Sequence, residues 1–242
     1  MSRTAYYYQA KRPDDREIID LLLTLTEKHP RWGFDKCRKR IKALGYTWNH
    51  KRIYRVYLML QLNLKRKGKR RLPSRNPLPL LVPEAMNQCW SLDFMSDSLA
   101  HGHRFRTLNV LDDYDREALG IDVNTGMRAT RVVSYLDQIA AWRGYPLRVR
   151  VDNGPEFISS DFTDWAEQHG IHVDYIKPGS PYQNGFIERF NRTYREEVLN
   201  LYLFSTLDEV RKITDEWLEI YNLERPHKSL NDMTPIEYLN AA

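Results

Sequence analysis

Residues 147–154 read Leu147-Arg148-Val149-Arg150-Val151-Asp152-Asn153-Gly154, an alternation of apolar and polar side chains that stops at an Asn-Gly pair. Alternation with a period of two predicts a strand with Leu147, Val149 and Val151 on one face, and the Asn-Gly pair predicts a turn directly after it. Asp152 is therefore expected at the carboxyl end of a strand, the edge at which open α/β sheets bind their ligands.

A second acidic residue, Glu188, follows Asp152 after 35 intervening residues, in a segment with helical spacing. The apolar side chains of this segment recur every three or four residues and form one stripe. They are Ile187, Phe190, Tyr194 and Val198. Glu188 lies off this stripe, on a face that it shares with Arg192 and Arg195.

A third acidic residue, Asp93, lies inside the strand-like run 89–95. A carboxylate within an apolar strand is costly unless a cation or a hydrogen-bond donor accompanies it. Each acid alone has a simpler interpretation: Asp152 as the hydrogen-bonding partner of a tight turn, and Glu188 as an exposed helix residue. Together, acids on a strand, at a strand end and on a helix predict a divalent-metal site.

The composition limits the class of protein. A chain of 242 residues is long enough to bury a core as one or two domains. It contains no apolar run of about 18 residues and no apolar leader after Met1, so we expect no membrane span and no signal peptide. With only Cys37 and Cys89, a disulfide framework is not expected, which suits a reducing cytoplasm, and no zinc-module spacing is present.

The net charge of +5 conceals two halves of opposite sign. Residues 1–75 hold 21 Lys and Arg against 6 Asp and Glu, whereas residues 76–242 hold 16 against 26. A basic module of this density usually meets a polyanion, and an acidic one can hold cations.

The basic half begins with an N-terminal arm, 1–12, and continues with a predicted three-helix module, 13–64. The third helix starts at His50 behind the N-cap Asn49 and carries Lys51, Arg52 and Arg55 in its first turns. Three short helices with a tight turn before the last resemble a helix-turn-helix, which contacts DNA through the start of its final helix. A generic basic bundle with solvated charges is the alternative.

A basic and proline-rich linker, 65–83, follows this module. Its run Lys65-Arg66-Lys67 is too charged to pack, so we interpret it as a segment that tracks DNA phosphates. A linker that only adds solubility is the alternative.

Residues 84–242 are predicted to form a mixed α/β domain. Three close strands (90–95, 104–110 and 117–123) suit an antiparallel meander, and a helix over 130–143 precedes the strand that ends at Asp152. A helix over 160–169, a strand over 172–176 and the Glu188 helix complete the order βββαβαβα. That order is the topology of a ribonuclease H-like sheet, in which the first and fourth strands are parallel neighbours. Residues 208–221 and 234–239 are expected to be helical, with a polar loop, 221–230, between them.

The motifs around the three acids resemble the DDE core of insertion-sequence transposases and retroviral integrases. The resemblance rests on WSLDF at 90–94, VDNGPEF at 151–157, SPYQNGFIERFN at 180–191, and Asn222-x-x-Arg225-Pro226-His227. Arg195 matches the basic residue that these families place two helical turns after the glutamate. The last motif is similar to OrfB-type transposases of elements with two overlapping reading frames, and the likeness covers about 13–239.

The resemblance implies a chemistry. Asp93, Asp152 and Glu188 are expected to hold two Mg²⁺ ions, with Mn²⁺ as a substitute, because paired hard cations about 4 Å apart stabilise both oxygens of an in-line phosphodiester displacement. Without metal, converging carboxylates repel one another, so at least one is expected to have a raised pKa. Arg195 is expected to grip a DNA phosphate, with an ion pair to a glutamate of its helix as the alternative. Tyr182 and Gln183 are expected to touch bases near the cut.

The function implied is Mg-dependent strand cleavage and strand transfer at insertion-sequence ends, by a cytoplasmic, nucleoid-associated bacterial protein. Its expected partners are transposon-end and target DNA, an upstream OrfA product, and further copies assembled on DNA. A ribonuclease H-like nuclease that does not join strands is one alternative. A DNA-binding regulator with an inactive core is the other.

Overall fold

The computed structural model describes residues 6–7, 14–64, 80, 82–177 and 184–241. The chain divides into two compact units, Met1–Gly68 and Lys69–Ala242. The division falls inside the stretch expected to be the basic linker. Among the described residues, no helix is both long and apolar enough to cross a bilayer.

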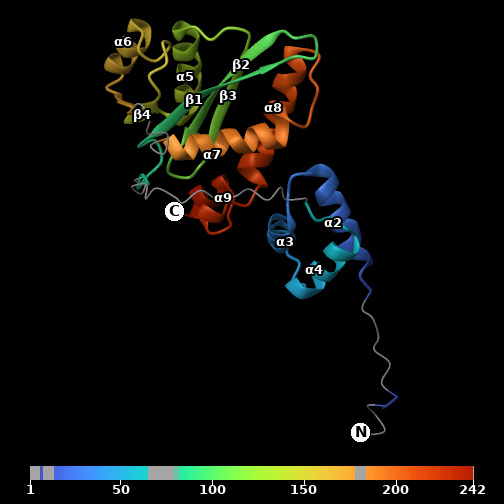
Figure 1. The fold of residues 1–242 in the computed structure, drawn as a ribbon. Helices are drawn as coiled ribbons and strands as arrows, with labels where there is room; N and C mark the ends of the chain where they lie inside the picture. Colours follow the sequence, from blue (N-terminus) through green and yellow to red (C-terminus); the bar gives the residue numbers. More distant parts are fainter. Residues whose placement is uncertain (1–5, 8–13, 65–79, 81, 178–183, 242) are drawn as a thin grey trace. The chain divides into compact units, whose positions relative to one another are not determined.

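The first unit contains three helices: α2 (Arg16–Lys28), α3 (Phe34–Ala43) and α4 (His50–Met59) (Figure 1). Asn49 caps α4 as predicted, because its side chain accepts from the backbone N–H of Lys51 at 2.9 Å. The helix was expected to reach about Leu62 but ends at Met59, since Gln61 adopts a left-handed φ of 54°.

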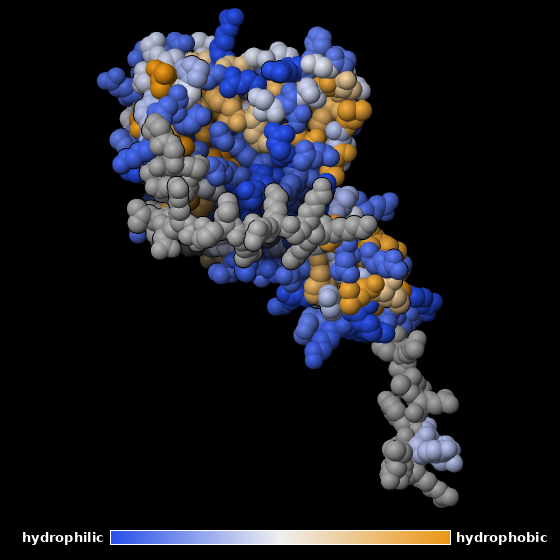
Figure 2. All heavy atoms as spheres, viewed as in Figure 1, coloured by the Kyte–Doolittle hydropathy of each residue, from blue (hydrophilic) through white to orange (hydrophobic). Residues whose placement is uncertain are grey.

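Apolar side chains from all three helices form the core of this unit. They are Ile18, Leu22, Leu25, Cys37, Ile41, Ile53, Val56 and Tyr57, with Trp32 from the connection before α3. Other large apolar side chains, Leu58 and Met59 among them, remain exposed, and hydrophobic patches reach the surface of this unit in Figure 2.

The second unit is built on a five-stranded mixed sheet in the order β3-β2-β1-β4-β5 (Figure 1). The strands are β1 (Trp90–Ser98), β2 (Arg104–Asp112), β3 (Ala118–Asn124), β4 (Arg148–Val151) and β5 (His172–Tyr175). β1 pairs with β2, and β2 with β3, in antiparallel register, whereas β1–β4 and β4–β5 are parallel. The predicted meander and the predicted parallel neighbours β1 and β4 are both confirmed.

Helices cover both faces of the sheet, and each face has its own apolar core. Trp90 and Leu92 of β1 pack with α5 and α6, whereas Met95 packs with α7 and α8. The helices are α5 (Ala129–Arg143), α6 (Ser160–Gln168), α7 (Gly185–Tyr194) with the π-helical turn η2 (Arg195–Leu199), α8 (Leu207–Leu223), the short η3 (Lys228–Leu230) and α9 (Pro235–Ala241). The predicted stripe on the Glu188 helix is confirmed as the buried face of α7 and η2.

The second unit differs from the sequence predictions at two places. Leu147 was expected on the buried face of a strand but precedes β4 and is 69% exposed, so Val149 and Val151 alone face the core. The expected polar loop, 221–230, is only partly a loop, because α8 continues to Leu223. Its Arg225 is buried and pairs with Glu197 at 3.2 Å, so the polar character of the segment reflects an internal ion pair.

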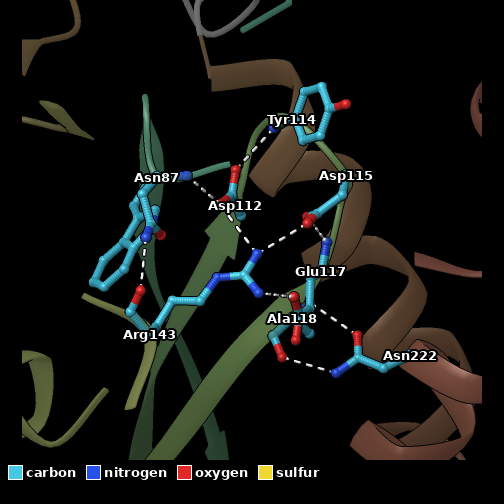
Figure 3. Close-up of polar contacts among 9 residues, drawn as sticks. Asn87, Asp112, Tyr114, Asp115, Glu117, Ala118, Arg143 and Asn222 are labelled. Carbon is cyan, nitrogen blue, oxygen red and sulfur yellow. Dashed lines mark hydrogen bonds and ion pairs between the residues drawn. The ribbon is translucent and has the colours of Figure 1, made fainter. Parts of the chain in front are cut away.

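A buried acidic cluster joins the β2–β3 turn to α5 (Figure 3). The Arg143 guanidinium lies 2.7 Å from Glu117, 2.9 Å from Asp115 and 3.5 Å from Asp112. One cation thus serves three buried carboxylates. Burial raises the pKa of Asp115 to about 6 and that of Glu117 to about 7, with Arg143 opposing the rise and neighbouring acids adding to it.

We predict that this cluster makes stability depend on pH. The folded pKa of Glu117 lies above its ordinary value of 4.5, so its stabilising contribution is present below that value and is lost as pH rises through about 7. Glu117→Gln should remove roughly 2 kcal/mol of the decline in the free energy of unfolding between pH ~5 and ~8. Urea titrations at both pH values measure this decline.

The exposed Glu216 of α8 supplies a matched control, and Glu216→Gln should leave the decline unchanged. An equal decline in Glu117→Gln and in the unmodified protein would contradict the role of the cluster.

Candidate active site

The β1–β4 register brings two of the three predicted acids together. Trp90 pairs with Val149 and Ser91 with Arg150. Continued for two more residues, this register sets Asp93 beside Asp152. Asp93 alternates with the inward Leu92 and so faces the α7 side of the sheet, where Glu188 lies in the first turn of the helix.

The Asp93 carboxylate is held by two hydrogen bonds. Its Oδ1 accepts from the backbone N–H of Phe94 at 2.8 Å, and its Oδ2 accepts from Nδ2 of Asn191 at 2.7 Å. The pKa of Asp93 is raised to about 6: burial is the largest cause, the charges of Asp152 and Glu188 contribute, and both hydrogen bonds oppose the rise. The expected raised pKa is therefore present, with burial rather than repulsion as its largest cause.

Asp152 and Glu188 are more exposed than Asp93. Asp152 Oδ1 accepts from the backbone N–H of Gly154 at 2.9 Å, which is the local turn bond that its simpler interpretation predicted. Burial raises the pKa of Glu188, and Arg192 partly offsets that rise. Within the described part of the chain, no three His, Cys, Asp or Glu side chains already converge on a point where a metal ion would sit.

The loop after Asp152 is anchored from β2. Arg106 forms an ion pair with Glu156, and its guanidinium carbon lies 4.4 Å from the ring centroid of Phe94. Phe94 in turn stacks on Phe157, with ring centroids 4.9 Å apart. Glu156 and Arg106 thus hold the loop in place, and no local sequence pattern indicated the contribution of Arg106.

Two buried amides at the site were not predicted. Asn109 lies opposite Asp93 in the β1–β2 ladder, and its Nδ2 donates to Oδ1 of Asn191 at 2.6 Å. Asn191 lies three residues after Glu188, inside a motif already noted. Its place one helical turn beyond the glutamate was the signal that could have identified it.

Arg195 already contacts two residues of β1. Its Nη1 lies 3.2 Å from Oδ2 of Asp97, and its Nη2 donates to the carbonyl oxygen of Ser96 at 3.0 Å. The alternative ion pair was expected with a glutamate of the same helix, but the partner is an aspartate of β1. A DNA contact by Arg195 stays a prediction.

The other acids near strand ends have partners of their own. Asp112 and Asp115 share Arg143, and Asp113 pairs with Arg150 at 2.7 Å. These ion pairs give Asp112, Asp113 and Asp115 a structural role in the fold.

The predicted DNA-binding residues of the helical unit fall into two groups. Arg52 and Arg55 both pair with Asp15, at 2.9 and 2.5 Å, which ties the start of α4 to the start of α2. Lys51 is exposed. The remaining predicted contacts lie outside the described residues. They are Lys65, Arg66, Lys67, Tyr182 and Gln183.

This sheet and its covering helices have the ribonuclease H-like arrangement of an integrase-type core. Two family models described as "Integrase core domain" match the chain, at residues 83–181 and 169–235. An insertion element IS407 protein of Burkholderia multivorans is 38% identical over 98% of this chain and 86% of its own length. The chain belongs to the family of insertion-sequence transposases with an integrase core, and its function is DNA transposition.

More distant similarities are found as well. The putative transposase InsK of element IS150 from Escherichia coli is 24% identical over 98% of this chain and 89% of its own length. Among solved structures, a chain of the simian T-cell lymphotropic virus intasome, in complex with a PP2A regulatory subunit, shares the fold. Its TM-score is 0.54 at 17% identity, over 81% of this chain and 68% of that one.

We predict that Arg106 and Glu156 are energetically coupled. Because the pair is partly buried and charge-assisted, a double-mutant cycle with Arg106→Met and Glu156→Gln should give about 1–2 kcal/mol of coupling in the free energy of unfolding. The exposed pair Arg211–Asp208 on α8 is the control and should give roughly 0.5 kcal/mol or less. Additive effects at Arg106 and Glu156 would show that the loop is held by other contacts.

Proposed function

We propose that Asp93, Asp152 and Glu188 form the active site for Mg²⁺-dependent strand cleavage and strand transfer at insertion-sequence ends. The observation that carries the proposal is the half-buried Asp93 carboxylate, whose pKa is raised by burial and by the charges of Asp152 and Glu188. A partly buried carboxylate with two acidic neighbours, on the side of the sheet that α7 covers, favours a bound cation.

The donor chemistry fits a hard divalent cation. All three side chains offer carboxylate oxygens, and each oxygen of Asp93 already accepts one hydrogen bond, which orients the group while leaving further lone pairs. Bound Mg²⁺, as two ions or with Mn²⁺ in its place, would activate the attacking oxygen and stabilise the leaving one. Because the three carboxylates do not yet converge, binding must draw the exposed Glu188 side chain towards Asp93.

The residues of the proposed site have distinct roles in the reaction. Asp93 is a fixed ligand on a central strand, whereas Asp152 lies on a loop that Arg106 and Glu156 hold in place. In the proposed reaction, water first cleaves a phosphodiester to free a 3′-OH, and that hydroxyl then attacks a second phosphodiester at the same site. No protein side chain becomes covalently attached. Arg195, Tyr182 and Gln183 are proposed to contact the DNA beside the cut.

The proposed partners are transposon ends, target DNA and further copies of the chain assembled on DNA. An upstream OrfA product is proposed to complete the recognition of the ends. In the helical unit, we retain Lys51 as the foremost DNA contact of α4, because Arg52 and Arg55 share the carboxylate of Asp15. The basic run from Lys65 to Lys67 is proposed to follow the phosphate backbone.

Removing one carboxylate charge should abolish both chemical steps. Asp152→Asn keeps an oxygen that can accept from Gly154, and Glu188→Gln keeps the length of an exposed side chain, so both variants should fold. We expect each to lower cleavage and strand transfer about a thousandfold or more, roughly 4 kcal/mol of barrier, with DNA affinity unchanged. Labelled transposon ends incubated with target DNA and Mg²⁺ report both steps by product length.

An exposed acid of α6 serves as the matched control: Asp164→Asn should retain both steps. Strand transfer at the normal rate by either active-site variant would refute the assignment. Cleavage without joining by the unmodified protein would instead favour a simple nuclease.

DNA binding should depend steeply on salt, with log K falling by about 0.9 per phosphate neutralised. In the full chain, Lys51→Gln should reduce this slope by about 0.9 if the lysine meets one phosphate, as α4 predicts. Lys212→Gln, at an exposed position on α8, is the comparison in the other unit. Fluorescence anisotropy across a salt series measures both slopes, and equal slopes for Lys51→Gln and the unmodified protein would exclude the contact.

A further inference from the structure

We propose that Asn109 and Asn191 form an amide relay that fixes the Asp93 carboxylate in the orientation needed to bind metal. Both are positioning residues, because neither is proposed to touch the substrate. The inference rests on the proposed function, in which Asp93 is a metal ligand.

Three side chains from three elements meet on the α7 side of the sheet. Asn109 of β2 donates from Nδ2 to Oδ1 of Asn191 at 2.6 Å, and Asn191 of α7 donates from Nδ2 to Oδ2 of Asp93 at 2.7 Å. Asn109 is fully buried and Asn191 is 8% exposed. Short bonds between buried groups are strong, so the relay links the strand that carries Asp93 to the helix that carries Glu188.

The relay has only one workable direction. An ionised Asp93 can only accept hydrogen bonds, so Asn191 must present its NH₂ group to it. The oxygen of Asn191 then faces Asn109, which must donate in turn. Asn109 therefore reinforces the orientation of the Asn191 amide that the ionised Asp93 requires.

This direction of the hydrogen bonds destabilises the fold at one buried atom. Oδ1 of Asn109 is buried and has no hydrogen-bond partner among the described residues. A buried unpaired acceptor usually destabilises a protein by about 1–3 kcal/mol. A pair of apolar side chains would hold α7 on the sheet without that cost, so packing of the helix alone does not account for two amides here. We infer that the two amides serve to orient the Asp93 carboxylate.

The consequence concerns the freedom of the carboxylate to rotate. Oδ1 is held by the Phe94 N–H and Oδ2 by Asn191, so the plane of the group is set before any ligand arrives. Loss of Asn191 leaves one restraint on the carboxylate, and in Asn109→Leu the Asn191 amide loses the donor that holds its oxygen. Outer hydrogen bonds of this kind typically contribute 10–100-fold to metal affinity.

The test uses the full chain and Mn²⁺ as the probe. Calorimetric titration without DNA should show Mn²⁺ binding weakened about tenfold in Asn109→Leu and in Asn191→Leu. In strand-transfer assays, the Mn²⁺ concentration for half-maximal rate should rise by a similar factor, with much of the rate restored at saturating Mn²⁺. Asn191→Ser, which deletes the amide with a smaller side chain, provides the same test if a leucine variant does not fold.

Thr107→Val is the matched control, because Thr107 is a buried residue two positions along the same face of β2 and lies outside the relay. It should bind Mn²⁺ normally. Folded relay variants with unchanged Mn²⁺ affinity would overturn the inference while leaving the proposed active site intact. If the unmodified protein and Asp93→Asn bind Mn²⁺ equally, the proposed metal site itself fails, and the relay with it.

Discussion

The partial burial of one carboxylate on a central strand is the constraint on which the second unit depends. Asp93 lies on β1, whose side chains pack into the apolar cores on both faces of the sheet, so an unpaired charge at this place would be expensive. The structure offsets part of that expense with two hydrogen bonds to the carboxylate. The remaining cost of the charge is seen in the raised pKa of Asp93. In a transposase, a bound cation would offset this cost.

In a second region of the same unit, buried carboxylates are stabilised by an arginine. Around Arg143, three buried carboxylates share a guanidinium at the end of the sheet where β2 turns into β3 (Figure 3). Asp113 likewise has its own arginine, Arg150. Asp93, by contrast, has no ion pair among the described residues, and its carboxylate is held by two hydrogen bonds alone.

Much of the fold was predictable because its signals are local. Strand alternation, helical stripes and the Asn49 cap each depend on neighbours within a few residues, and the element order then fixes which strands adjoin. The amide relay was not predictable, since Asn109 and Asn191 stand 82 residues apart and neither belongs to an apolar pattern. The pairing of Arg52 and Arg55 with Asp15 was not predictable for the same reason. Basic residues early in a helix predict DNA contacts when only the local sequence is considered, whereas their carboxylate partner lies far away in the chain.

The C-terminal part of α8 and the segment after it contact η2, the turn that continues α7. Arg225 lies against Glu197 in the π-helical turn, Trp217 donates to the same carboxylate, and the ring of Tyr221 meets His227 edge-on. A premature stop codon anywhere before this segment would thus strip the support from the helix that carries Glu188. A copy of the element shortened in this way could still encode all three acids and yet lack these contacts.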